Sequence, residues 1–404
     1  MGDRMVKPRR IALVTHSFER GGGVPAVTRW LRESLGAVGG YSTDVHDLAT
    51  SSRDSSSRRI VAPRTWIRRS LRSPTAHPSG YEHWGANAAE FEVMRYRPRR
   101  ELSAVLRQYD LIQVIAGSPA WAAAVTGLGV PVVLQVATLV AWERAALLSV
   151  PGGPLNAWRG TMTRFTSRIE RSALREVDAV LVENAVMLDH ARSLGQRHVV
   201  KAPPGVDTTF FVPGPEGWRR TGHLLSVCRL GDPRKGLDRT VRAYAEMVRR
   251  MPSTPPLVLA GRGVLPAATV ALVADLGLRD RVVVRSDVTP VDLLRLYQTA
   301  SVFVQTSYEE GLGVSVLEAM ACALPVVATA TAGSRETVSD GETGWLVAQS
   351  PESEVPARIA DRVLDILADP RCELGLRGRQ RCLTNFSTTA ALQCFTDTYD
   401  KLLS

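Results

Sequence analysis

Short apolar runs alternate with amphipathic stretches along the whole 404-residue chain. The apolar runs are rich in Val, Ile and Leu and have the length of buried strands, whereas the stretches between them have helical periodicity. This alternation is typical of α/β proteins with parallel sheets. In the first half we predict a helix at Val24–Val38 and strands at Ile11–Thr15, Leu111–Val114, Val130–Val136 and Ala179–Val182.

A second series of the same kind follows a stretch rich in proline and glycine. Residues 201–216, KAPPGVDTTFFVPGPE, favour loops and turns, so we predict a domain boundary there. The predicted parts are an N-terminal domain at 1–203, a linker at 204–216, a C-terminal domain at 217–385 and a final amphipathic helix within 386–404. The second domain has predicted strands at His223–Val227, Pro256–Ala260, Arg281–Val284, Val302–Gln305 and Pro325–Ala328.

Length and composition agree with two domains of a cytoplasmic protein. The chain is long for one core, and it has no run of about 18 apolar residues that would span a membrane. Ile11–Thr15 has only strand length, so we interpret it as a first strand rather than part of a signal peptide. The five cysteines are dispersed, which favours reduced thiols. Neither metal-ligand spacing of His and Cys nor an Asp-x-Asp pair occurs, so we predict no metal and no cofactor.

Most of the net charge of +10 comes from the first quarter of the chain. Residues 1–100 contain 18 Lys and Arg but only 9 Asp and Glu. The densest part is the basic segment 58–72, in which arginines alternate with Ile60, Trp66, Ile67 and Leu71. Three interpretations stay open: a solvated loop, an acceptor-binding loop, or a segment that contacts an anionic membrane surface. No recognition motif for nucleic acid accompanies the charge.

Two glutamates eight positions apart form the most specific pattern in the sequence. Glu310 follows the strand that ends near Gln305, and Glu318 lies about one turn inside the next predicted helix. Ligands of parallel sheets bind at this end of the strands, and the backbone amides that open the helix at Val314 favour an anion. Acidic residues near a helix start also complement the helix dipole, so a capping role is the alternative.

Two further strand-to-helix loops carry groups suited to a phosphorylated ligand. Arg229 and Lys235 lie in one loop and offer two cationic groups to a diphosphate, with Arg234 as a competitor for the second position. Arg262 follows the next strand. In the first domain three consecutive glycines that include Gly22 and Gly23 open a helix, although the same residues also fit a plain turn.

Together these segments resemble the retaining glycosyltransferases of family 4, also called glycosyl transferases group 1, which have the GT-B fold. The resemblance covers nearly the whole chain. It rests on the GGGV loop at 21–24, PPGVDTTFF at 203–211, SVCRLGDPRKG at 226–236, LAGRG at 259–263 and the block 308–347 with the paired glutamates. It implies two Rossmann-like parallel-sheet domains that face each other across a cleft, with helix 386–404 crossing back to the N-terminal domain.

The resemblance also implies roles for single residues. Glu318 would accept hydrogen bonds from the ribose, Glu310 would contact the donor sugar, and Arg229 and Lys235 would neutralise the diphosphate. Further donor contacts are implied for Gly22, Gly23, Gly311, Leu312, Gly313 and Val314. We therefore expect a metal-independent hexosyltransferase (EC 2.4) that uses a nucleoside-diphosphate sugar, with UDP as the expected nucleotide. Glu310, Arg229 and Lys235 are the expected catalytic residues.

One position departs from the family pattern. Family members often carry a histidine just after the strand that matches Val130–Val136, where this chain has Ala137 and Thr138. The departure bears on the donor sugar more than on the reaction class. His16, at the end of the first strand, is a possible substitute or a hydrogen-bonded loop histidine. His16, Thr138 and Arg262 are therefore candidate secondary contacts.

Two other functions stay open, and the acceptor is undetermined. The same fold serves catalytically silent nucleotide-binding or scaffold proteins, and it serves phosphorylases and epimerases. The basic segment suits a lipid-linked glycan at an anionic membrane. The mixed Trp and Arg content of residues 51–100 equally suits a small polar natural product.

Overall fold

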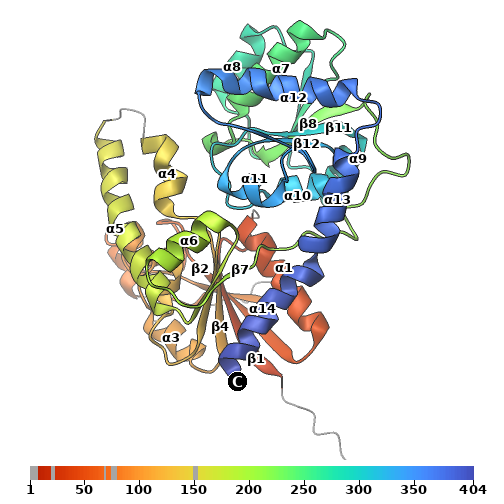
Figure 1. The fold of residues 1–404 in the computed structure, drawn as a ribbon. Helices are drawn as coiled ribbons and strands as arrows, with labels where there is room; N and C mark the ends of the chain where they lie inside the picture. The colour runs from red at the N-terminus through yellow and green to blue at the C-terminus, as the bar shows by residue number, and fades with distance from the viewer. Residues whose placement is uncertain (1–7, 20–22, 68–69, 74–79, 149–152) are drawn as a thin grey trace, which may run out of the picture. The chain divides into compact units, whose positions relative to one another are not determined.

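The protein has two compact α/β units in a computed structural model that describes residues 8–19, 23–67, 70–73, 80–148 and 153–404 (Figure 1). Unit 1 comprises Met1–Pro204 together with Leu392–Ser404, and unit 2 comprises Gly205–Ala391. Each unit contains one wholly parallel sheet, so the expectation of two Rossmann-like domains is confirmed. The expected cleft between the domains stays a prediction.

The sheet of unit 1 has the strand order β3-β2-β1-β4-β5-β6-β7. All four predicted strands are present, although β5 begins two residues later than expected. Sequence patterns missed three strands, because β2 and β3 are largely polar and β7 is very short. The strands are β1 Arg9–His16, β2 Tyr41–Leu48, β3 Tyr81–Trp84, β4 Leu111–Ala116, β5 Val132–Val136, β6 Ala179–Val182 and β7 Val199–Lys201.

Helices cover both faces of this sheet, as burial of a parallel sheet requires. One face packs against α1 (Gly23–Val38) and the C-terminal helix α14 (Thr388–Leu403), whose Phe395 and Tyr399 are fully buried. The Tyr399 hydroxyl donates to Gln113 Oε1 at 2.8 Å, which joins α14 to β4. The remaining helices of the unit are η1 Pro63–Ile67, α2 Glu92–Arg95, α3 Arg100–Leu106, η2 Pro119–Ala124, α4 Val140–Leu148, α5 Pro154–Glu176 and α6 Ala185–Ser193.

The sheet of unit 2 has the order β10-β9-β8-β11-β12-β13. All five predicted strands are present, and the three-residue β13 was missed. The strands are β8 His223–Arg229, β9 Leu257–Arg262, β10 Val282–Ser286, β11 Ala300–Gln305, β12 Val326–Thr329 and β13 Trp345–Val347. The helices are η3 Pro233–Lys235, α7 Leu237–Arg250, α8 Ala267–Asp275, α9 Pro290–Thr299, α10 Val314–Ala321, α11 Ala332–Thr337, η4 Glu352–Glu354, α12 Val355–Ala368 and α13 Leu374–Asn385.

The two cores of unit 2 lie on opposite faces of β8 and β11. Leu224, Val302 and Val304 point to one side, and Leu225 and Phe303 point to the other. Because β8 and β11 are buried on both faces, side chains beyond their carboxyl ends are held on a rigid base. Within the described residues no helix is long and apolar enough to cross a membrane, and the five cysteines are free thiols.

Candidate functional site

The carboxyl ends of two paired strands in unit 2 bring two predicted site residues together. Strands β8 and β11 are parallel neighbours, so the loops that leave them lie side by side. Lys235 Nζ and Glu310 Oε1 are 2.6 Å apart, and both side chains are mostly buried, with 15% and 11% exposed. The Ser307 hydroxyl donates to the same glutamate oxygen at 2.7 Å. Burial strengthens the attraction between the two charges but removes their hydration, so loss of either partner leaves a costly buried charge. The pair joins the two loops at one edge of the sheet.

Arg229 and Arg234 take different places in the same loop. Arg229, the last residue of β8, is 57% exposed and bonds to Asp232 Oδ2 at 2.8 Å. Arg234 is mostly buried between Asp232 and Glu309, so it is a structural cation and does not compete with Lys235. Although burial opposes it, hydrogen bonding from Arg234 lowers the pKa of Asp232. Arg229 thus keeps a surface that a ligand can reach.

Arg262 lies beside Arg229. The register of β8 and β9 pairs these two residues at the strand ends. Arg262 is exposed at the same edge of the sheet. The structure therefore adds this secondary candidate to the cationic cluster.

The loop between Glu310 and α10 depends on glycine at two points. Gly313 precedes the first residue of α10, Val314, with φ of 83°, a left-handed conformation that glycine adopts without strain. Gly333 in α11 approaches the loop so closely that a Cβ there would lie 2.6 Å from the Leu312 backbone. Its amide donates to the Glu310 carbonyl at 2.9 Å. The segment from Glu310 to Val314, with Gly311 and buried Leu312, is thus clamped by α11, a contact that sequence spacing did not reveal.

Glu318 lies one turn inside α10, as predicted, but its partner comes from a different element. The buried Tyr297 of α9 donates its hydroxyl to Glu318 Oε2 at 2.7 Å. Burial raises the pKa of Glu318 to about 7. The carboxyl group therefore changes charge near neutral pH, whereas a helix-capping glutamate in solvent would stay ionised.

His16 and Thr138 both bond to Gly117 at the strand ends of unit 1. The Gly117 amide donates to His16 Nε2 at 3.5 Å, and the Thr138 amide donates to the Gly117 carbonyl at 3.2 Å. His16 also stacks on Trp121, with ring centroids 4.8 Å apart. Burial lowers the pKa of His16 to about 4, so the ring is neutral at physiological pH.

The predicted glycine loop is only partly described. Gly22 lies outside the described residues. Gly23 is the first residue of α1, and a Cβ there would meet no atom within 4 Å. The donor contact expected of these two glycines stays a prediction.

The described part of the basic segment exposes apolar side chains. Ile60, Val61, Trp66 and Ile67 are all exposed, with Ile67 at 81%. Arg58 lies over the Trp66 ring at 6.0 Å, and the Trp66 indole donates to the Arg59 carbonyl at 2.8 Å. Residues 58–67 thus form a basic loop with exposed apolar side chains, which we call its apolar tip.

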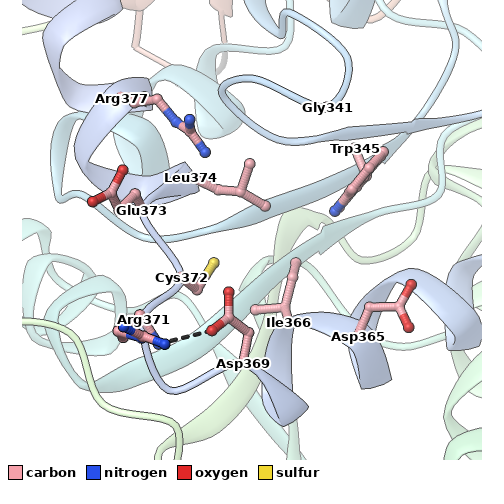
Figure 2. Close-up of a pocket in the computed structure, with 10 residues that line it drawn as sticks. All are labelled: Gly341, Trp345, Asp365, Ile366, Asp369, Arg371, Cys372, Glu373, Leu374 and Arg377. Atoms are coloured by element: carbon pink, nitrogen blue, oxygen red, sulfur yellow. Dashed lines mark hydrogen bonds between the residues drawn. The ribbon is translucent and has the colours of Figure 1, made fainter.

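A cavity of about 290 Å³ in unit 2 involves none of the predicted donor residues (Figure 2). Figure 2 shows Trp345 and the side chains of α12 and the start of α13 around it, with acidic and basic groups on its walls. Its walls come from β13, α12, the start of α13 and the loops before β13 and α13, rather than from the loops after β8 and β11. Cavity size alone therefore does not identify the chemistry of this unit.

Comparison with known proteins places the chain in a family. The family model "Glycosyl transferases group 1" matches residues 220–381, which include the loops after β8, β9 and β11. A D-inositol 3-phosphate glycosyltransferase of Arthrobacter sp. FB24 is 31% identical over 311 residues, 72% of this chain and 69% of that protein.

Two further matches agree. A GDP-mannose-dependent alpha-(1-6)-phosphatidylinositol monomannoside mannosyltransferase of Mycolicibacterium smegmatis is 36% identical over 204 residues, 46% of this chain and 51% of that protein. This match spans about half the relative's length. The solved structure of sucrose-phosphate synthase from Thermosynechococcus elongatus is 22% identical, with a TM-score of 0.71 over 98% of this chain and 99% of that one, which shows a shared fold. The chain belongs to the glycosyl transferases group 1 family.

Proposed function

We propose that the protein is a retaining glycosyltransferase that moves a sugar from a nucleoside-diphosphate sugar to an acceptor hydroxyl. The observation that carries the proposal is the buried Lys235–Glu310 pair beside the exposed Arg229, at the ligand-binding edge of the family-matched sheet. The cations Lys235 and Arg229 suit a diphosphate, and the carboxylate of Glu310, in the loop before α10, suits sugar hydroxyls.

In this proposal the cations stabilise the leaving group. As the bond to the anomeric carbon breaks, negative charge gathers on the departing diphosphate, and Lys235 and Arg229 interact more strongly with it. Ser307 keeps hold of Glu310 when Lys235 turns to phosphate, so the carboxylate remains in position for the sugar. The reaction needs no protein nucleophile if a diphosphate oxygen accepts the acceptor proton on the same face.

Glu318 and the clamped glycine loop would complete the donor site. Ribose hydroxyls would replace or share the Tyr297 hydroxyl as donors to Glu318. The amides from Gly311 to Val314 lie at the start of α10, where the helix dipole favours a negative group.

The proposal also covers the base of the donor nucleotide and transfer without a metal ion. UDP was expected from the sequence, whereas one relative is named for GDP-mannose, so both bases are candidates. A thermal-shift panel of UDP, GDP, ADP and their sugars identifies the donor, because the tightest ligand stabilises the fold most. Repeating the transfer assay with EDTA tests metal independence, for which unchanged activity is expected.

The proposal is tested by removing the buried cation. Lys235→Ala should lower sugar transfer about 100-fold or more, because it removes charge stabilisation and leaves Glu310 without its cationic partner. Arg249→Ala is a matched control, since Arg249 is 71% exposed at the end of α7 and the charge change is the same. Full activity of Lys235→Ala and Glu318→Ala would disprove the site.

The alternatives predict different outcomes in the same assay. A silent nucleotide-binding protein would bind nucleotides without hydrolysis or transfer with any sugar nucleotide. A phosphorylase would require inorganic phosphate, and an epimerase would change the sugar without releasing nucleotide.

A further inference from the structure

A second polar cavity lies at the carboxyl ends of β1, β2 and β3 in unit 1. Its volume is about 200 Å³. It is lined by Ser17 after β1, by Asp47 in β2 and by His83 in β3, and also by residues 50–51 and 54–56 of the loop after β2. It is smaller than the roughly 300–1,000 Å³ typical of sites for drug-sized ligands, so it fits a single ring. The carboxyl edge of a parallel sheet is where ligands bind.

Hydrogen-bonding groups dominate the walls of this cavity. Six serine or threonine side chains, Tyr81 and the carboxylates of Glu19, Asp47 and Asp54 line it. Hydroxyls donate and accept, whereas carboxylates only accept. The walls therefore match a ligand that carries many hydroxyl groups.

The charged groups of this cavity disfavour an anionic ligand. His83 Nδ1 lies 2.7 Å from Asp47 Oδ2, and its Nε2 lies 2.7 Å from Asp54 Oδ2. Although burial opposes it, these bonds raise the pKa of His83 to about 9, so the ring is cationic, but both of its N–H groups are committed. Within the described residues neither Lys nor Arg lines the cavity.

Two arginines outside the lining partly offset the negative charge of the cavity wall. Arg99 is buried and interacts electrostatically with Asp54, while its Nε donates to the Gly85 carbonyl at 2.5 Å. Arg95 donates to the Thr50 carbonyl. These cations reduce the net negative charge around the cavity. Because they bond to backbone carbonyls and do not line the cavity, they offer no direct contact to a phosphate. An uncharged ligand is thus favoured over a phosphate.

From the cavity and its lining we infer that this site binds a neutral polyhydroxylated ring, a sugar or cyclitol, as part of the acceptor. The inference rests on the proposed function and gives its acceptor a chemical class. Relatives are named for acceptors that contain phosphate, such as D-inositol 3-phosphate. In this chain the cavity would take the hydroxylated ring, and an anionic group on the same acceptor would lie outside it.

The test compares a neutral and an anionic probe of the same ring. Binding of methyl α-glucoside and glucose 6-phosphate is measured by saturation-transfer NMR on the full chain at pH 7.5. The neutral probe should bind at least about tenfold more tightly, because the wall carboxylates repel phosphate. Both measurements are made with saturating UDP, GDP or ADP, whichever the thermal-shift panel shows to bind, so that the cations of unit 2 are occupied. Equal or tighter binding of glucose 6-phosphate under these conditions, or no binding of the neutral probe, would overturn the inference.

A matched pair of surface variants locates the binding. Ser55→Lys places a cation on the cavity wall and should reduce the preference for the neutral probe about threefold or more. Ser52→Lys adds the same charge three residues away, outside the lining, and should leave the preference unchanged. Equal effects of the two variants would place the binding elsewhere.

Failure of this inference is distinguishable from failure of the proposed function. If Lys235→Ala abolishes transfer but Ser55→Lys leaves probe preference unchanged, the donor site stands and the cavity assignment is wrong. If the neutral probe binds but no sugar nucleotide supports transfer, the cavity stands as a polyol site and the transferase proposal is wrong.

Discussion

The two units place opposite chemistry at the same edge of similar sheets. In unit 2 the cations Arg229 and Lys235 project beyond β8, and Glu310 from the neighbouring loop neutralises one of them. In unit 1 the carboxylates of Asp47 and Asp54 line the cavity. The cation between them is His83, and each of its ring nitrogens bonds to one of the two carboxylates. The first arrangement suits a diphosphate and the second suits hydroxyl groups.

This difference shows how two units with the same type of parallel sheet can bind two different kinds of ligand. Parallel strands deliver their loops to a common edge in both units, so the fold supplies location and the loop residues supply specificity. A cation paired with a carboxylate can exchange partners for phosphate. A histidine fixed between two carboxylates instead holds them as acceptors.

Replacing His83 is expected to change the pH dependence of the free energy of unfolding more than any other substitution proposed in unit 1. Its pKa is raised from 6.5 to about 9 in the folded state, so its stabilisation is fully present below pH 6.5 and is lost as pH rises through 9. The wild-type free energy of unfolding should fall by on the order of 3 kcal/mol over this range. Urea denaturation at several pH values measures the change, and His83→Gln should remove it.

The control for this prediction is another histidine of unit 1. His198 is exposed before β7, so His198→Gln should leave the pH profile of unfolding unchanged. If wild-type stability does not decline between pH 6.5 and 9, His83 does not hold Asp47 and Asp54 together, and the contrast between the two units weakens.

In unit 2 the corresponding prediction concerns donor affinity. The pKa of Glu318 is raised to about 7, so the group is mostly neutral at pH 6 and mostly ionised at pH 8. Ribose hydroxyls bond more strongly to the carboxylate, so affinity for UDP-glucose or GDP-mannose should rise roughly tenfold from pH 6 to pH 8. Isothermal titration calorimetry measures this change, and sugar nucleotides are suitable because their diphosphates do not titrate in this range.

Glu318→Gln distinguishes this carboxyl group from other titrating groups. The variant keeps the size of the side chain and can still accept from Tyr297, but its charge does not change with pH. Its donor affinity should therefore be flat between pH 6 and pH 8. A pH dependence that persists in the variant would assign the titration to another residue.

The sequence predicted that Lys235 and Glu310 would lie at one edge of the sheet, because both residues closely follow predicted strands. Strands β8 and β11 each contain short apolar runs that predict a strand, and Arg229, Lys235 and Glu310 lie within ten residues of a strand end. The partners that it missed, Tyr297 and Gly333, come from α9 and α11. Their contacts with Glu318 and the glycine loop arise from packing between elements, which spacing along the chain does not encode.

The cavity of unit 1 was not predictable for the same physical reason. Asp47 and His83 lie in β2 and β3, whose polar composition does not follow the apolar pattern of buried strands, so both strands were missed. Asp54 precedes the basic segment, and no motif in the sequence singles it out. The three side chains meet because β2 pairs with β3 and the loop folds back over them.

A surface variant tests whether unit 1 also meets its acceptor at a membrane, and the expected effect is the smallest. Ile67 is 81% exposed in the basic loop, and Val264 is equally exposed in unit 2. If the loop inserts its apolar tip among anionic lipids, Ile67→Ser should lower co-sedimentation with anionic vesicles several-fold, whereas Val264→Ser should not. Binding should also weaken at high salt, because the arginines act through screened charges. Absence of wild-type binding at low salt would instead favour a small, freely diffusing acceptor for the cavity of unit 1.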